Sequence, residues 1–541
     1  MNRLDLRACA AALHAAYRSL WSRLPSEPRL PWRGLSSLLS RDSSRLFFLP
    51  CRRDSLSEPG PGGTPSGSGV SVASNPTLKI FVFIAAAALM LLHAQQGPDV
   101  TARVIKGAEL PVIAVPDLRA AGPAQSFMAA FNQTLWDDLL GSGVLKLAPK
   151  TLYPTGIPQQ PSDFRQPPPA NQAPRSRQGE LVAAPNGGGF WMSDWSNPPA
   201  AANYLAFGYA AEQNGVLMLF GNLFDLSRDT PANAQMIGKR YLASTGDEKG
   251  ARQMAHQFAA DILAMFGGKS LVGTHIYYVH QAGFRAPKEI WVMDFDGRNQ
   301  HSVTRFNSLS IEPSVSPDGA KIAFTSYAKG SPAIFVFSVD PVRDLRFYNQ
   351  VASMNGQPSF TPDGKQIVYS SSAGRCCRIF IAGLDGRGFR PITSGGFLDA
   401  EPKVNPKTGA NIVFSSGRSG PEQLYMMSMD GGDIERLTDG TGEASNPCWH
   451  PSGQLIAYAW TRGYAQGNFN IFTMDVVSRQ YLQLTHDQGR NENPSWAPDG
   501  AHLAFMSNRT GGSQIWSMLA DGTAQQQLTR DGLNYSPAWG L

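Results

Sequence analysis

The sequence is poor in cysteine and in charge. Only five of its 541 residues are cysteine, and charged side chains make up 16% of the total. Such a chain cannot form the dense disulfide framework of a small secreted domain, and its cysteines lack the CxxC pairs of structural zinc sites. Low charge also excludes a coiled coil. The chain is instead rich in glycine, with 54, and proline, with 40, which is typical of short strands joined by turns.

Outside its first segment the sequence has no excess of either charge sign. Residues 1–70 hold ten of the 47 lysines and arginines but only five of the 42 aspartates and glutamates, so the net charge of +5 arises there. In the rest of the chain basic and acidic side chains balance, and no basic surplus could follow a phosphate backbone. A nucleic-acid partner is therefore not expected.

No apolar run reaches the roughly 20 residues that a membrane-spanning helix needs. The most apolar run, Ile80–Leu92, has 13 residues. This length predicts a cleaved signal peptide over residues 79–94, with a buried helix or an uncleaved anchor as the alternative. A signal peptide begins close to the start of translation. We therefore expect residues 1–78 to be a disordered extension, with translation beginning near Val70 or Val72.

Residues 95–268 have the pattern of a small α/β domain. β-Branched runs predict strands, and apolar residues at helical spacing predict helices. A proline-rich stretch at 152–185 lacks the donors for a helix or a sheet, so we expect it to be an exposed insertion. The predicted elements are a strand at 111–116, a helix at 126–141, a hairpin about Asn214-Gly215 and a helix at 247–266.

From residue 269 onward the chain repeats one unit. A motif such as Pro494-Ser-Trp-Ala-Pro-Asp-Gly500 recurs, and its first proline falls at positions 313, 358, 402, 447, 494 and 537. The regular intervals of 43 to 47 residues indicate a repeat architecture. Each full interval holds four short apolar segments separated by turn residues, which is the content of one propeller blade.

The two ends of the repeat region complement each other. Ser536–Trp539 is a first strand without the other three, and residues 276–304 hold three strands without a first. Pairing Pro537–Trp539 with Ile276–Val279 completes a sixth blade and removes unpaired sheet edges. We therefore predict a multidomain fold, an N-terminal α/β domain followed by a six-bladed all-β propeller over residues 269–541.

An exported α/β domain followed by six repeats with a Pro-x-Trp-x-Pro-Asp-Gly motif resembles the TolB family of the Tol–Pal system, found in the envelope of double-membraned bacteria. The resemblance covers residues 99–541 and is most specific in the repeats and the closing Pro-Ala-Trp strand. It implies a non-enzymatic, monomeric scaffold of the periplasm that supports outer-membrane integrity and cell division. In this family the propeller face binds the peptidoglycan-associated lipoprotein Pal, and the inner-membrane protein TolA recognises the mature N-terminus.

The resemblance also assigns partner contacts to residues of this chain. Contact with a Pal-like lipoprotein is expected at Met354, Asn355, Gly356 and Gln357, and at Asp399, Ala400 and Glu401. The family often has histidine where this chain has Met354. Contact with a TolA-like protein is expected at Val100, Thr101, Ala102, Arg103, Val104 and Ile105.

An enzymatic propeller is the alternative interpretation, since similar propellers gate serine peptidases or act as polysaccharide lyases. The GxSxG motif of a serine hydrolase and the HExxH motif of a zinc protease are absent. A lyase would bring histidines and carboxylates together in the channel, but the histidines at 275, 280, 301, 450, 486 and 502 follow no repeated pattern. No catalytic residue, metal ligand or cofactor is predicted, and a calcium ion bound in the channel is left as an alternative.

Overall fold

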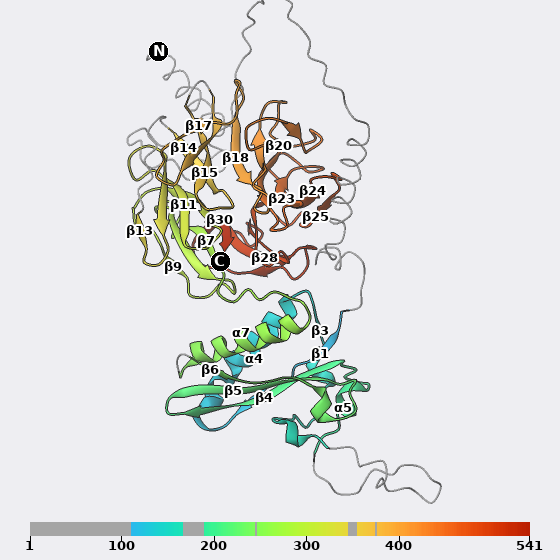
Figure 1. The fold of residues 1–541 in the computed structure, drawn as a ribbon. Coiled ribbons are helices and arrows are strands. Elements are labelled where there is room, and N and C mark those ends of the chain that lie inside the picture. The colour runs from blue at the N-terminus through green and yellow to red at the C-terminus, as the bar shows by residue number, and fades with distance from the viewer. Residues whose placement is uncertain (1–109, 166–188, 244–245, 345–353, 374–375) are drawn as a thin grey trace, which may run out of the picture.

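The computed structural model describes residues 110–165, 189–243, 246–344, 354–373 and 376–541. It consists of an α/β domain that ends with helix α7 (Glu248–Met265) and a propeller that begins with strand β7 (His275–Gln281) (Figure 1). The predicted fold class is therefore confirmed. The predicted signal peptide, the extension before it and the expected TolA-like contact at 100–105 all lie outside the described residues.

A six-stranded mixed sheet forms the centre of the first domain. Its strands lie in the order β3-β1-β4-β5-β6, and β2 pairs with β4. The pairs of β1 with β3 and β4 are parallel, whereas β4, β5 and β6 are antiparallel neighbours. The bounds are β1 (Val112–Ala114), β2 (Arg119–Ala120), β3 (Lys146–Leu147), β4 (Tyr204–Gln213), β5 (Val216–Asp225) and β6 (Gln235–Leu242).

Helices α4 (Met128–Gly141) and α7 cover one face of this sheet. Phe131 and Leu135 of α4 and Phe258 of α7 are fully buried against it. The Asp247 carboxylate caps α7 by accepting a hydrogen bond from the Gly250 N–H at 2.9 Å. These helices match the two that the sequence predicts. The remaining short helices are η2 (Gly122–Phe127), η3 (Lys150–Leu152), η4 (Pro161–Asp163), α5 (Ser193–Ser196) and α6 (Pro231–Ala234).

The opposite face of the sheet carries a second, aromatic core. Phe164 packs edge-on against Phe207 and close to Phe224, and Trp195 is completely buried beside them. Phe164 belongs to the stretch at 152–185 that was expected to be exposed. Most of the described part of that stretch is exposed or half-buried, but Phe164 is buried on the sheet, where it gains apolar burial.

The propeller consists of six four-stranded antiparallel sheets. The first five blades follow one another in sequence, with their strands in chain order from the channel outward. Their bounds are β10 (Ser310–Val315), β11 (Lys321–Ser326), β12 (Ala333–Ser338), β13 (Arg343–Asp344); β14 (Asn355–Phe360), β15 (Gln366–Ser371), β16 (Arg378–Gly383), β17 (Arg390–Pro391); β18 (Asp399–Val404), β19 (Asn411–Ser416), β20 (Gln423–Ser428), β21 (Glu435–Arg436); β22 (Ala444–Trp449), β23 (Leu455–Trp460), β24 (Asn470–Asp475), β25 (Tyr481–Gln483); β26 (Asn491–Trp496), β27 (His502–Ser507), β28 (Gln514–Leu519) and β29 (Gln526–Gln527).

The sixth blade joins the two ends of the repeat region, as predicted. C-terminal strand β30 (Leu533–Gly540) pairs with β7, which continues to β8 (Glu289–Asp294) and β9 (His301–Ser302). Ala538 lies opposite Tyr277 and Trp539 opposite Ile276. Strand β30 thus covers the edge of β7 that would otherwise be unpaired, and the sixth blade has four strands like the other five.

In five of the six blades a threonine that follows the outer strand bonds back to the third strand. The Thr393 Oγ1 accepts a hydrogen bond from the Ile379 N–H at 3.0 Å, and Thr438 does the same for Leu424 at 3.1 Å. Thr304, Thr485 and Thr529 repeat this contact. The recurring Leu-Thr, Ile-Thr and Val-Thr pairs therefore follow outer strands that are only two or three residues long, and they close these five blades at their rims.

The first domain covers one face of the propeller. The His502 Nε2 is 2.7 Å from the Gly141 carbonyl oxygen at the end of α4, and Leu519 lies beside Gly143. His502 is the first residue of β27 and Leu519 is the last residue of β28. Figure 1 shows the first domain beside one face of the propeller, close to β28. We call this the covered face. Because neighbouring strands are antiparallel, the loops that precede the inner strands lie on the opposite, open face.

Helix α7 has 18 residues and only one apolar side. Within the described parts of the chain, no helix combines the length and apolar character needed to cross a bilayer.

We predict that Trp539→Ala destabilises the whole propeller. Its side chain is 7% exposed, packs among residues of β7 and donates a hydrogen bond to Thr274 Oγ1 at 3.0 Å. Loss of a buried aromatic ring in a core costs about 3–5 kcal/mol. The free energy of unfolding in urea should fall by that amount. Leu541→Ala, at a side chain that is 53% exposed, serves as control and should change it by less than about 0.5 kcal/mol. A loss below about 1 kcal/mol for Trp539→Ala would show that the last strand does not hold the ring closed.

Candidate functional site

Six residues, one from each blade, line the central channel, and we call them the channel ring. Each stands directly before the first proline of its repeat and has a left-handed backbone, with φ between 46° and 56°. In every inner strand the pairing register shifts across this residue and its proline, so the two form a β-bulge. The channel ring consists of Glu312, Gln357, Glu401, Asn446, Asn493 and Ser536.

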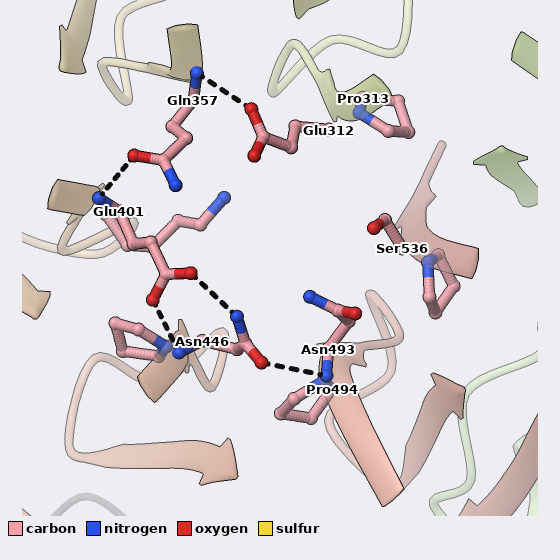
Figure 2. A pocket seen from close by; sticks show the side chains of 11 residues that line it. Glu312, Pro313, Gln357, Glu401, Asn446, Asn493, Pro494 and Ser536 are labelled. Atoms are coloured by element: carbon pink, nitrogen blue, oxygen red, sulfur yellow. Dashed lines mark hydrogen bonds between the residues drawn. The ribbon is translucent and has the colours of Figure 1, made fainter. Parts of the chain in front are cut away.

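A relay of hydrogen bonds links consecutive members of the ring (Figure 2). The Gln357 N–H donates to Glu312 Oε2 at 3.2 Å, and the Glu401 N–H donates to Gln357 Oε1 at 3.0 Å. Asn446 donates to Glu401 twice, from its backbone N–H at 2.6 Å and from Nδ2 at 2.7 Å. The Asn493 N–H reaches Asn446 Oδ1 at 3.4 Å. Four links thus join five consecutive blades, from the one with Glu312 to the one with Asn493, at the channel wall.

The left-handed conformation explains how a backbone amide can bond across blades. In an ordinary strand the N–H groups lie in the plane of their own sheet. A bulge with positive φ turns one N–H out of that plane, here toward the side chain of the preceding blade. Asparagine adopts this conformation readily, whereas Gln357 and Glu401 adopt it at a cost that the bonds between blades must offset.

Two buried carboxylates give the channel its electrostatic character. Burial raises the pKa of Glu312 to about 7, and a hydrogen bond from Thr325 Oγ1 at 3.0 Å partly opposes this rise. Burial also raises the pKa of Glu401, although Ser415 and Asn446 donate hydrogen bonds to it. Lys403 lines the same channel, and its charge favours the ionised form of both acids.

The channel is narrow, with a volume of about 70 Å³. Calcium requires six to eight oxygen ligands. Most side-chain oxygens of Glu312, Gln357, Glu401 and Asn446 already accept protein hydrogen bonds, and only Glu312 Oε1 is buried without one. Among the described residues no group of three or more His, Cys, Asp or Glu side chains could hold a metal ion. The arrangement therefore does not fit a calcium ion.

The open face begins where the inner strands start. Next to the third blade Phe397 is 45% exposed and lies under the Arg418 guanidinium, 5.6 Å from its ring centre. The Arg418 Nη2 bonds Asp399 Oδ1 at 2.7 Å, and the Asp399 side chain is only 1% exposed. An exposed aromatic ring thus packs against an arginine whose position is fixed by a buried carboxylate.

The residues expected to contact a Pal-like partner lie at the starts of β14 and β18. Met354 is half-buried, whereas the other six are buried. Gln357 and Glu401 belong to the channel ring, and Asn355 and Asp399 accept hydrogen bonds from Ser371 and Ser416 of the neighbouring strands. The structure therefore brings the two groups together at the channel mouth, with their side chains turned inward.

Sequence reasoning missed four members of the channel ring: Glu312, Asn446, Asn493 and Ser536. Their signal was available, because each stands directly before the first proline of a repeat. Aligning the repeats by that proline would have placed all six at one position.

The propeller histidines do not converge on the channel. In the described residues none of them lines it. His450 instead links the fourth and fifth blades, with Nε2 2.9 Å from the Gly500 carbonyl oxygen and its ring edge-on to Trp496.

Comparison with known proteins agrees with this architecture. The family model described as the TolB beta propeller domain matches residues 264–464 and 439–540. The protein TolB homolog of Chlorobium chlorochromatii is 31% identical over 260 residues, which cover 48% of this chain and 46% of the relative. The Tol-Pal system protein TolB of Bordetella pertussis is 39% identical over 207 residues, covering 38% of this chain and 46% of the relative. These alignments thus span less than half of each relative.

The fold also matches a solved structure. The crystal structure of TolB from Acinetobacter baumannii aligns with a TM-score of 0.62 at 21% sequence identity, covering 80% of this chain and 97% of that one. At this identity the match concerns the fold, and it includes both domains.

We predict that Glu312→Gln removes a pH-dependent cost of folding. The unfolded carboxyl titrates near its ordinary value of 4.5, whereas the folded one titrates at about 7. Protonated Glu312 therefore favours the folded state below pH 4.5, and this contribution is lost as pH rises to about 7. At about pH 8 the variant should be more stable than the wild type by about 1–3 kcal/mol, and at pH 4.5 the two should be equal.

Urea unfolding across this pH range measures the difference. Glu212→Gln, on β4 of the first domain, is the control and should parallel the wild type throughout. A constant difference between Glu312→Gln and the wild type from pH 4.5 to 8 would contradict the assignment of this cost to Glu312.

Proposed function

The chain belongs to the TolB β-propeller family, and from this premise we propose that it is a non-enzymatic periplasmic scaffold of a Tol–Pal system. Its open propeller face binds a Pal-like peptidoglycan-associated lipoprotein, and its N-terminal tail binds a TolA-like protein of the inner membrane. In this role it supports outer-membrane integrity and cell division.

The observation that carries the proposal is the division of the propeller into two unequal faces. The first domain occupies the covered face, through contacts such as that of His502 with Gly141. The open face presents loops anchored on closed blades, so their positions are set before a partner arrives. Binding to such a surface orders few groups, and this favours protein recognition without refolding.

The proposed lipoprotein site is centred on the second and third blades. Met354 and Phe397 are its accessible members, because Asn355, Gln357, Asp399 and Glu401 are buried. We assign the buried residues the task of holding the inner strands and the channel mouth in place. An apolar surface pair beside an ion-paired arginine is the composition expected at the centre of a protein interface.

The proposed TolA-like site consists of residues 100–105, which precede the first described strand β1 by seven or more positions. Placing one partner on the tail and the other on the open face lets both bind without competing for one surface.

We predict that Met354→Asp and Phe397→Ala weaken capture of a Pal-like lipoprotein. Loss of a central apolar contact, or placing a charge there, reduces affinity by about tenfold or more. Binding of the purified periplasmic domain of the lipoprotein by calorimetry measures this. Val477→Asp, at an 87% exposed side chain in the turn after β24 and away from the open face, is the matched control and should bind as the wild type does.

The outcomes separate the parts of the proposal. If the wild type binds the lipoprotein but Met354→Asp and Phe397→Ala bind equally well, the site lies elsewhere. If the wild type binds no Pal-like lipoprotein and cleaves a polysaccharide instead, the scaffold function is wrong. Deletion of residues 95–109 should abolish binding of a TolA-like domain and leave lipoprotein binding unchanged.

A further inference from the structure

The two domains meet at a cleft of about 140 Å³ whose walls come from both. Residues of helices α4 and α7 form one wall, and residues of propeller turns and of strands β28 and β30 form the other. Figure 1 shows both helices on the side of the first domain that faces the propeller. Its polar lining includes Asp138 and His256 of the first domain and Asp296, Arg298 and His502 of the propeller. Titratable groups of both domains therefore face each other across this boundary.

His256 lies between two carboxylates that belong to different domains. Its Nδ1 is 2.7 Å from Asp138 Oδ2 on α4, within hydrogen-bond distance. Its Nε2 is 3.7 Å from Asp296 Oδ2 in the turn between β8 and β9, close enough for an ion pair. The ring also packs edge-on against Phe295 of the same turn, with centroids 5.0 Å apart. The charged imidazole is thus attracted to both sides of the boundary.

His502 makes a similar contact across the boundary, but from the propeller to the first domain. It belongs to the propeller, and its Nδ1 is 2.5 Å from Asp499 Oδ2. Its Nε2 points at the Gly141 carbonyl oxygen at 2.7 Å, in the last turn of α4. The carboxyl end of a helix carries partial negative charge, which favours a cation there. The same helix end therefore carries Asp138, which His256 contacts, and Gly141, which His502 contacts.

The surroundings favour the charged form of both rings. Burial opposes protonation of His256, but the hydrogen bond and charge of Asp138 and the charge of Asp296 outweigh it and raise its pKa to about 9. Burial likewise opposes protonation of His502, and Asp499 outweighs it and raises the pKa. The other charged groups of the cleft are Asp137 on α4, Lys269 in the connecting segment and Arg298 beside Asp296.

We propose that His256, assisted by His502, is a charge latch that holds the N-terminal domain on the covered face of the propeller and releases it when the rings lose their protons. In the latched state each imidazolium joins a carboxylate of its own domain to an acceptor of the other. Without the proton, His256 no longer attracts Asp296, and the last turn of α4 loses its hold on the propeller. The proposal goes beyond the scaffold function and holds whichever partners bind.

Amide hydrogen exchange of the full chain, followed by mass spectrometry and corrected for the intrinsic effect of pH, tests the latch. The readout is protection in residues 138–145 and 294–300, which lie on the two sides of the cleft. Between about pH 7 and about pH 10 the wild type should lose protection in both segments by about fivefold or more. The direction follows because a pKa raised in the folded state stabilises below it and not above it.

Three variants make the test specific. His256→Gln should show low protection at pH 7 and no further loss at pH 10. Asp296→Asn keeps an acceptor for the Arg298 N–H but removes the charge, and should also lower protection at pH 7. Asp385→Asn is the matched control, because Asp385 accepts the Arg387 N–H at 3.0 Å in the equivalent turn of the second blade, away from the cleft.

Each outcome decides for or against the latch. The proposal is overturned if His256→Gln retains wild-type protection at pH 7, or if it loses as much protection as the wild type on raising the pH. If His256→Gln does not fold, Asp296→Asn decides. Wild-type protection in that variant at pH 7, or equal losses in Asp296→Asn and Asp385→Asn, would then rule the latch out.

Discussion

The molecule depends on one backbone constraint, the left-handed bulge that each inner strand forms before its repeat proline. An inner strand has a sheet neighbour on one side and the channel on the other, so its amides on the channel side would lack partners. The bulge turns one of these amides toward the preceding blade, where Gln357, Glu401 or Asn446 supplies an oxygen. The proline that follows has no N–H to satisfy. One local conformation thus gives backbone amides of the channel wall their hydrogen-bond acceptors and ties neighbouring blades together.

The same constraint decides what kind of site the channel can be. Most of the oxygens that line the channel accept hydrogen bonds from amide groups of neighbouring blades, so they stabilise the ring and are not free to bind a ligand. The exception is Glu312 Oε1, which is buried and accepts no hydrogen bond. Ionising this carboxyl in a buried position is unfavourable, and its pKa is raised for that reason. The accessible chemistry of the propeller therefore lies outside the channel, on the open face and along the boundary with the first domain.

The fold could be predicted from the sequence because the repeats have a regular length and a recognisable motif. Six prolines at regular intervals count the blades, and the incomplete units at the two ends show how the ring closes. The secondary structure of the N-terminal domain was predicted less completely. Strand β6 escaped prediction because Lys239 and Arg240 stand side by side in it and break the alternation of an edge strand.

The candidate site was predicted only in part. Gln357 and Glu401 were singled out through a family resemblance as surface contacts, whereas their side chains lie in the channel wall. Sequence alone does not reveal this, because a bulge changes the side to which a side chain points without changing the strand pattern. The cleft was invisible for a different reason: Asp138, His256 and Asp296 are far apart in sequence and meet only when the two domains are in place.

The contacts between blades and those between the two domains differ in chemistry, and this difference determines which parts of the molecule can separate without unfolding. Consecutive blades are joined by apolar clusters, such as the one that holds Trp539 of the sixth blade together with Ala504 and Ile515 of the fifth. Separating the blades would expose that surface to water. The cleft between the domains has apolar walls in part, from residues such as Phe295 and Leu519, but an ion pair and hydrogen bonds of histidine also cross it, and water can replace these. Apolar boundaries open only with unfolding, whereas a polar boundary can open at a modest cost. Movement between the domains is therefore the change of shape that this architecture permits while its ring stays closed.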